Sequence, residues 1–161
     1  MRTQSIETKV NIYGFDELPM AVRNLINAAK NAVSYSYSPY SKFSVGAAVL
    51  LKDGEVYMAN NQENAAYPSG LCAERVAIFY ANAQSPATPV TSIAIAAYSK
   101  GEFLESPITP CGACRQVLLE TEHRFGTPID IYLYGTKEIF HIQGAQQLLP
   151  LCFGKESLVS V

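Results

Sequence analysis

Hydrophobic positions along the first half of the chain follow two different periods. Apolar residues with helical spacing follow Asp16 and Pro19, which are residue types that favour the start of a helix. Over residues 43–51 the apolar positions alternate instead, as is typical of a strand. The Asp-Gly pair at 53–54 is a strong hairpin signal before a partner strand at 56–59. The pattern therefore predicts a helix followed by a β-hairpin.

The second half alternates between expected helices and strands. Helices are expected to begin at Cys72 and Cys111, strands to cover 90–98, 129–134 and 139–142, and a loop to cover 100–110. A strand, helix, strand succession makes a parallel pair, because the crossover helix packs back onto the sheet. The order predicts an α/β fold, namely a three-layer α/β/α mixed sheet of about five strands with helices on both faces.

No repeat or linker divides the sequence, so we expect an N-terminal arm over residues 1–13 and a single domain over residues 14–161. Val10 and Ile12 alternate as in a short strand before Gly14. Only 16% of the residues are charged while 48% are apolar, which favours a globular chain with some surface buried in an oligomer.

The net charge of −2 argues against binding to nucleic acid polymers, which requires a basic surface. The N-terminus has no apolar signal segment, and the apolar runs are too short to span a membrane. We therefore expect a cytoplasmic protein without membrane contact. In that compartment its four cysteines are better explained as ligands, nucleophiles or core residues than as disulfides.

Two segments carry the candidate chemistry, residues 72–75 (Cys-Ala-Glu-Arg) and residues 110–116 (Pro-Cys-Gly-Ala-Cys-Arg-Gln). Cys111 and Cys114 are three residues apart, so both thiols lie on one face at the start of a helix. The positive end of the helix dipole lowers the pKa of a thiol and favours the thiolate that binds metal. Cys72, at the start of another helix, would complete three ligands and leave the fourth position of a tetrahedral zinc for water.

Glu74 lies two residues from the first ligand, and we expect it to act as general base and then general acid. On a cytosine ring the water oxygen would attack C4, and the amino group would leave as ammonia. Three thiolates carry an excess of negative charge, which Arg75 or Arg115 can offset by hydrogen bonds to sulfur, and we favour Arg75. We expect Gln116, like Arg75, to lie next to the zinc ligands and support them without binding the metal itself.

These segments resemble the cytidine deaminase family of small, homo-oligomeric nucleoside deaminases. The resemblance covers residues 18–153 and includes three further stretches, at 37–48, 61–67 and 148–153. It implies that the activity is hydrolytic deamination of cytidine and 2′-deoxycytidine to uridine and 2′-deoxyuridine, as in pyrimidine salvage. It also implies one Zn²⁺ per subunit, held by Cys72, Cys111 and Cys114, with Glu74 as the proton shuttle.

The same resemblance assigns the substrate contacts. Phe43 would lie against the pyrimidine, and the backbone of Ala73 would contact it. Asn61 and Glu63 would bind the sugar 3′-hydroxyl. Tyr67 would line the pocket, and Phe153 would reach the base of an adjacent subunit in a homotetramer whose sites lie at subunit interfaces.

Several alternatives remain open at this point. A Cys-x-x-Cys pair alone also suits a redox centre or half of a structural zinc site. Phe43 in an alternating strand is by default a core residue, and Asn61 and Glu63 in a loop are by default solvated. The substrate can be another cytosine compound, or the chain can be a zinc-stabilised binding module without turnover.

Overall fold

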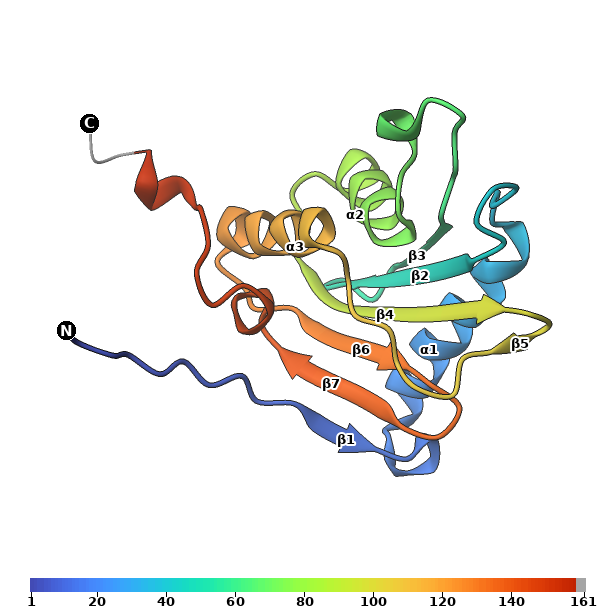
Figure 1. Ribbon diagram of the computed structural model, residues 1–161, viewed down its shortest axis with the longest axis horizontal. Coiled ribbons are helices and arrows are strands. Elements are labelled where there is room, and N and C mark those ends of the chain that lie inside the picture. Colours follow the sequence, from blue (N-terminus) through green and yellow to red (C-terminus); the bar gives the residue numbers. More distant parts are fainter. Residues whose placement is uncertain (159–161) are drawn as a thin grey trace.

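A mixed seven-stranded sheet with helices on both faces forms the centre of the molecule in the computed structural model, which describes residues 1–158 (Figure 1). Its order is β1-β7-β6-β4-β2-β3, and β5 pairs with β4. The strands are β1 (Asn11–Tyr13), β2 (Ser44–Leu51), β3 (Val56–Asn60), β4 (Val90–Ser99), β5 (Glu102–Phe103), β6 (Asp130–Tyr134) and β7 (Ile139–Gln143).

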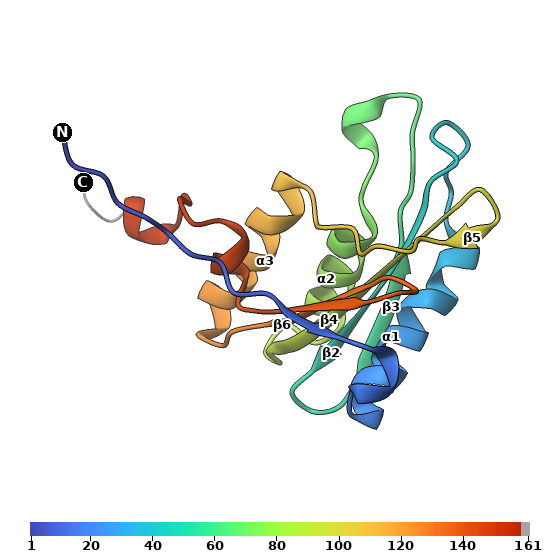
Figure 2. The same cartoon turned by 60° about the horizontal axis from the view of Figure 1, so that its bottom comes forward.

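The three α-helices within residues 1–158 divide between the two faces of this sheet. Helix α1 (Met20–Ala32) covers one face, and α2 (Ala73–Gln84) and α3 (Gly112–Phe125) cover the other (Figures 1 and 2). Ile26 of α1 belongs to one hydrophobic cluster with Ala48, whereas Ile78 of α2 belongs to a second cluster with Val49. Neighbouring residues of β2 thus contact opposite layers, because strand side chains alternate between faces. The predicted three-layer architecture is confirmed.

The topology brings the first turns of α2 and α3 to one edge of the sheet. Strands β3 and β4 both pair antiparallel with β2, so they point in the same direction. Helix α2 follows β3 and α3 follows β4 along the chain. Because the carboxyl ends of β3 and β4 lie at the same edge, the two helices begin there too, as in other α/β folds that bind ligands beyond their strand ends. Strand β4 pairs in parallel with β6, as the strand, helix, strand succession predicts.

Two short strands add to the five expected in the domain, and one of them, β1, is the short strand that the alternation of Val10 and Ile12 indicates before Gly14. Strand β5 covers only two residues inside the expected loop, too few to reveal a period of two. Strand β1 has only three residues and pairs with β7 at the sheet edge, with Ile12 opposite Phe140. A 3₁₀ turn over Ala145–Leu148 follows β7. None of the described helices is both long and apolar enough to cross a membrane.

Gly46 allows α1 to approach β2 closely, and replacing it with alanine is expected to destabilise the fold. A Cβ atom there would lie 2.0 Å from the Ala29 carbonyl oxygen and 2.8 Å from the Val33 nitrogen, which are backbone atoms of the α1 segment. Overpacking that requires a helix to move costs about 3 kcal/mol or more in the free energy of unfolding. Urea unfolding of Gly46→Ala measures this loss. Gly14→Ala is the control, because only the Glu17 side chain is nearby, and equal losses would contradict the packing argument.

Candidate active site

Three cysteine sulfurs meet where α2 and α3 begin. Cys72 is the residue before the first turn of α2, Cys111 is the residue before the first turn of α3, and Cys114 lies in that turn. All three Sγ atoms lie within 4.8 Å of one another. The Sγ atoms of Cys72 and Cys111 are 3.8 Å apart, and those of Cys111 and Cys114 are 3.5 Å apart. Two helices from distant parts of the sequence therefore present one cluster of thiols.

The spacing of these sulfurs fits a tetrahedral zinc ion. Zinc bound by sulfur at about 2.3 Å places its ligand atoms about 3.8 Å apart. Neither Cys72 nor Cys111 uses its side chain to cap its own helix, so both thiols are available to a metal. The N–H groups of two helix starts and their dipoles favour negative charge at this point. A catalytic zinc site typically takes three ligands from its protein, and these three thiols supply that number.

Arg75 provides positive charge beside the cluster. Its Nη2 donates to the Cys72 Sγ at 3.9 Å. Together the thiol of Cys114 and this guanidinium stabilise the thiolate and lower the pKa of Cys72 to about 5. The hydrogen bond of Cys114 to the Cys72 thiolate, together with burial, raises the pKa of Cys114.

Arg115 makes a different set of contacts. It donates to the carbonyl oxygens of Pro110 and Leu148 and to the Thr109 hydroxyl, which ties the start of α3 to the segments around it. Of the two candidate arginines, Arg75 is the one that reaches a sulfur.

Glu74 is a carboxyl group buried beside the thiols. It is the second residue of α2 and only 5% exposed, which is rare for a carboxyl group without a paired charge. Burial raises its pKa above the usual range, and the negative charge of Cys72 adds to this effect. A carboxyl group whose pKa is moved towards neutrality can both accept and return a proton. Its position beside a candidate metal cluster marks it as a candidate acid-base group.

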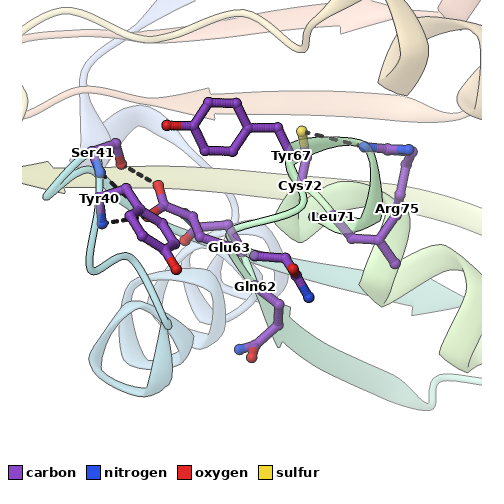
Figure 3. Close-up of a pocket in the computed structure, with 11 residues that line it drawn as sticks. Tyr40, Ser41, Gln62, Glu63, Tyr67, Leu71, Cys72 and Arg75 are labelled. Carbon is purple, nitrogen blue, oxygen red and sulfur yellow. Dashed lines mark hydrogen bonds between the residues drawn. The ribbon is translucent and has the colours of Figure 1, made fainter.

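A cavity of about 520 Å³ opens beside Cys72, a volume typical of small-molecule sites. Figure 3 shows Tyr40, Ser41 and Glu63 on one side of it and Cys72 with Arg75 on the other. The residues that line it are Tyr40, Ser41, Asn61, Gln62, Glu63, Asn64, Tyr67, Gly70, Leu71, Cys72 and Arg75. Three predicted substrate contacts, Asn61, Glu63 and Tyr67, therefore share one cavity with a predicted metal ligand.

The carboxylate of Glu63 is held by the loop that precedes β2. It accepts hydrogen bonds from the backbone N–H groups of Tyr40 (2.9 Å) and Ser41 (3.3 Å), and from the Ser41 hydroxyl. The Ser41 hydroxyl contributes most to lowering the pKa of Glu63. An ionised carboxylate accepts hydrogen bonds only, so a ligand group that meets Glu63 must donate.

Asn61 has a structural role beside its place in the cavity wall. Its Oδ1 accepts from the Val45 N–H at 2.8 Å, and its Nδ2 donates to the Phe43 carbonyl at 2.9 Å. These bonds fix the start of β2 next to the cavity. Among residues 1–158 the second N–H of the Asn61 amide has no partner, so a ligand hydroxyl would have to accept from it.

The other predicted contacts lie outside the cavity lining of this single chain. Phe43 packs partly buried against the cluster beneath α2 and α3, and Ala73 is fully buried. Gln116 donates its Nε2 to the Phe153 carbonyl at 2.9 Å, which holds the C-terminal segment against α3. The side chain of Phe153 is 60% exposed and does not line the cavity.

Two cavity residues, Tyr40 and Ser41, were given no role from the sequence. They lie in a polar, aromatic loop whose composition indicates only a turn. Their signal in the sequence is weak, because their contact with Glu63 spans 22 residues and depends on how two loops pair.

Comparisons with known proteins agree with this site. The model of the cytidine and deoxycytidylate deaminase zinc-binding region matches residues 20–125. The chain is 40% identical to a cytidine deaminase of Sporosarcina psychrophila over 139 residues, covering 86% of this chain and 96% of the relative. It is 39% identical to a cytidine deaminase of Halalkalibacterium halodurans over 140 residues, covering 83% and 95% of the two chains.

A solved structure gives the same result for the fold. The crystal structure of cytidine deaminase from Burkholderia pseudomallei superposes with a TM-score of 0.68 at 39% identity, over 81% of this chain and 97% of that chain. The matched residues 20–125 include the three clustered cysteines and Glu74. From the cysteine cluster at two helix starts, the buried carboxyl beside it and these similarities, the chain belongs to the cytidine deaminase family.

Proposed function

We propose that this chain catalyses the hydrolysis of cytidine and 2′-deoxycytidine to uridine and 2′-deoxyuridine, with release of ammonia. The observation that carries the proposal is the meeting of three thiols beside a buried carboxyl, with one of those thiols, Cys72, lining one end of a nucleoside-sized cavity. At the other end of the cavity lies Glu63, a carboxylate suited to a sugar hydroxyl. The arrangement therefore offers the thiols and the buried carboxyl to the base of a nucleoside, and Glu63 to its sugar.

Cys72, Cys111 and Cys114 would hold the zinc ion, which when bound supplies Lewis-acid activation of a water molecule. Glu74 accepts a proton from the attacking water on a carboxylate oxygen as the water oxygen bonds to C4 of the cytosine ring. It delivers this first proton to ring N3, and it then takes the second water proton from the new C4 hydroxyl and passes it to the amino group. The C4–N bond breaks and ammonia leaves, so that one water is consumed for each ammonia released.

Recognition of the sugar falls to the other end of the cavity. Glu63 accepts a hydrogen bond from the 3′-hydroxyl, and the remaining N–H of Asn61 donates to it. Both proposed substrates carry this hydroxyl, so neither is excluded. Phe43 and the backbone N–H of Ala73 are proposed to contact the base, and Tyr67 is proposed to cover the cavity from the side.

The substrate range is tested by comparing cytidine, 2′-deoxycytidine and free cytosine. We expect turnover of both nucleosides, with kcat/KM for cytosine lower by about 100-fold or more, because free cytosine cannot make the hydrogen bonds that the 3′-hydroxyl makes to Glu63 and Asn61. Equal rates for free cytosine would contradict the sugar contacts. If the protein converts none of the three but does convert a modified cytosine nucleoside, its substrate is another cytosine compound and the proposed substrates are wrong.

The assembly proposed for the active protein is a homotetramer with sites at the interfaces. Its support is the exposure of two aromatic side chains at or near the site, Tyr67 (77%) and Phe153 (60%). Phe153 lies outside the cavity of its own chain. In the tetramer, Phe153 of one copy would contact the base that is bound in the cavity of an adjacent copy. Light scattering should give a mass near four times the 17.6 kDa of one chain. A fully active monomer would contradict this assembly.

A further inference from the structure

We propose that Ser41 is a positioning residue, which aims the Glu63 carboxylate into the cavity and thereby sets the preference for a sugar hydroxyl. This inference rests on the proposed nucleoside site and adds a residue to it. Ser41 touches neither a metal ligand nor the proposed position of the base.

The hydrogen bonds of the Ser41 hydroxyl leave only one direction for its proton. The Oγ accepts from the Phe43 N–H at 3.0 Å, so this partner already supplies a proton. A hydroxyl has one proton to donate, and the remaining partner is the Glu63 carboxylate, which can only accept when ionised. The hydroxyl therefore donates to Glu63 Oε1, in a charge-assisted hydrogen bond of the stronger kind. The same contact holds the pKa of Glu63 below its usual range.

The backbone around Ser41 fixes the second carboxylate oxygen. Glu63 Oε2 accepts from the N–H groups of Tyr40 and Ser41, so both oxygens are held by two consecutive residues (Figure 3). The main chains of the two loops also pair, since the Glu63 N–H donates to the Tyr37 carbonyl at 2.8 Å. The carboxylate is thus oriented before any ligand arrives, which lowers the cost of ordering it on binding.

The turn that presents Ser41 is itself strained and closely held. Lys42 has a φ of 56°, in the left-handed region that residues other than glycine rarely adopt. Its N–H donates to the Ser38 carbonyl at 3.1 Å, and the next N–H, of Phe43, donates to Ser41. Strained backbone of this kind persists where surrounding contacts determine the conformation, as at binding sites.

Ser41 also connects the two ends of the proposed nucleoside site. The Phe43 N–H is bound by Ser41, and the Phe43 carbonyl is bound by Asn61. The residue proposed to contact the base is therefore fixed at both of its backbone polar groups by residues of the sugar end. Loss of the Ser41 hydroxyl should act first on Glu63, because Asn61 still holds Phe43.

The test compares ligands with and without the 3′-hydroxyl in the zinc-loaded protein. In the wild type we expect uridine to bind at least about tenfold more tightly than 3′-deoxyuridine, since hydrogen bonds to charged groups are the stronger ones. In Ser41→Ala the preference should fall to about threefold or less, and Ser41→Thr should restore it. The KM for cytidine should rise about tenfold with kcat nearly unchanged, because a contact made equally in ground and transition states affects KM alone.

Ser38→Ala is the matched control, because that hydroxyl lies in the same turn but bonds Ser36 and Ser44 rather than Glu63. The Ser38→Ala variant should prefer uridine over 3′-deoxyuridine as strongly as the wild type does. If Ser41→Ala lowers affinity equally for both ligands, its role is structural only and the proposal fails. A wild type that turns over cytidine but shows no 3′-hydroxyl preference also overturns it while deamination stands. A wild type that neither binds nor converts any nucleoside overturns both the proposed function and this inference.

Discussion

Replacing Glu74 with glutamine is expected to lower kcat for cytidine by about a thousandfold while zinc and fold are retained, since a positioned acid-base group contributes about 10²–10⁴-fold. Glutamine has nearly the same shape and cannot carry the proton between water and substrate. Glu74 is only 5% exposed, and a neutral glutamine amide at this position avoids burying a charge. The melting temperature should therefore not fall. Steady-state kinetics, zinc content and thermal unfolding of the same preparation measure the three effects.

The contrast between catalysis and metal content decides the role of Glu74. Retention of more than about a tenth of wild-type activity would count against it as the proton shuttle. Loss of zinc together with activity would instead indicate that the carboxyl supports the metal site. A zinc-bound and folded but inactive variant is the outcome that the buried position beside Cys114 predicts.

Replacing Cys114 with alanine is expected to abolish both zinc binding and turnover. Its sulfur is fully buried and lies 3.5 Å from the Cys111 sulfur, so no other side chain can take its place without a rearrangement of α3. Two remaining thiols give too few ligands for a stable zinc site, and zinc content should fall below about a tenth of one ion per chain. The melting temperature should fall as well, because metal binding adds to folding stability.

Cys152→Ala is the matched control for this experiment. Cys152 is an exposed free cysteine outside the metal cluster. The variant should keep about one zinc per chain, as a single catalytic site requires. Equal loss of zinc in both variants would show that the metal is held elsewhere or by nonspecific thiol contacts.

The cysteine cluster could be predicted from the sequence because its members are concentrated at two helix starts. Cys72 and Glu74 share one short segment, and Cys111 and Cys114 share another. Helix geometry places such neighbours on one face, so only the meeting of two segments had to be inferred. The family resemblance supplied that step, and the sulfur distances agree with it.

The contacts that position Glu63 could not be predicted, because they depend on the pairing of two irregular loops. Tyr37 and Gln62 form an isolated bridge, which has no periodic signal in the sequence. Only this pairing brings Ser41 to Glu63. The bonds of the Asn61 amide to the start of β2 were missed for the same reason.

Strand β5 shows a related limit. It has only two residues, too few to give a period of two in the sequence. The central strand β2 has eight residues and packs on both faces, so its alternating small and branched residues were recognisable.

The most direct test of the central claim is to incubate purified, zinc-quantified protein with cytidine and to measure uridine and ammonia together. The account predicts equal amounts of both products, with about one zinc per chain, and loss of turnover on removal of the metal by a strong chelator. Failure to deaminate cytidine with zinc fully bound would contradict the claim that the cysteine cluster and Glu74 form a cytidine deaminase active site.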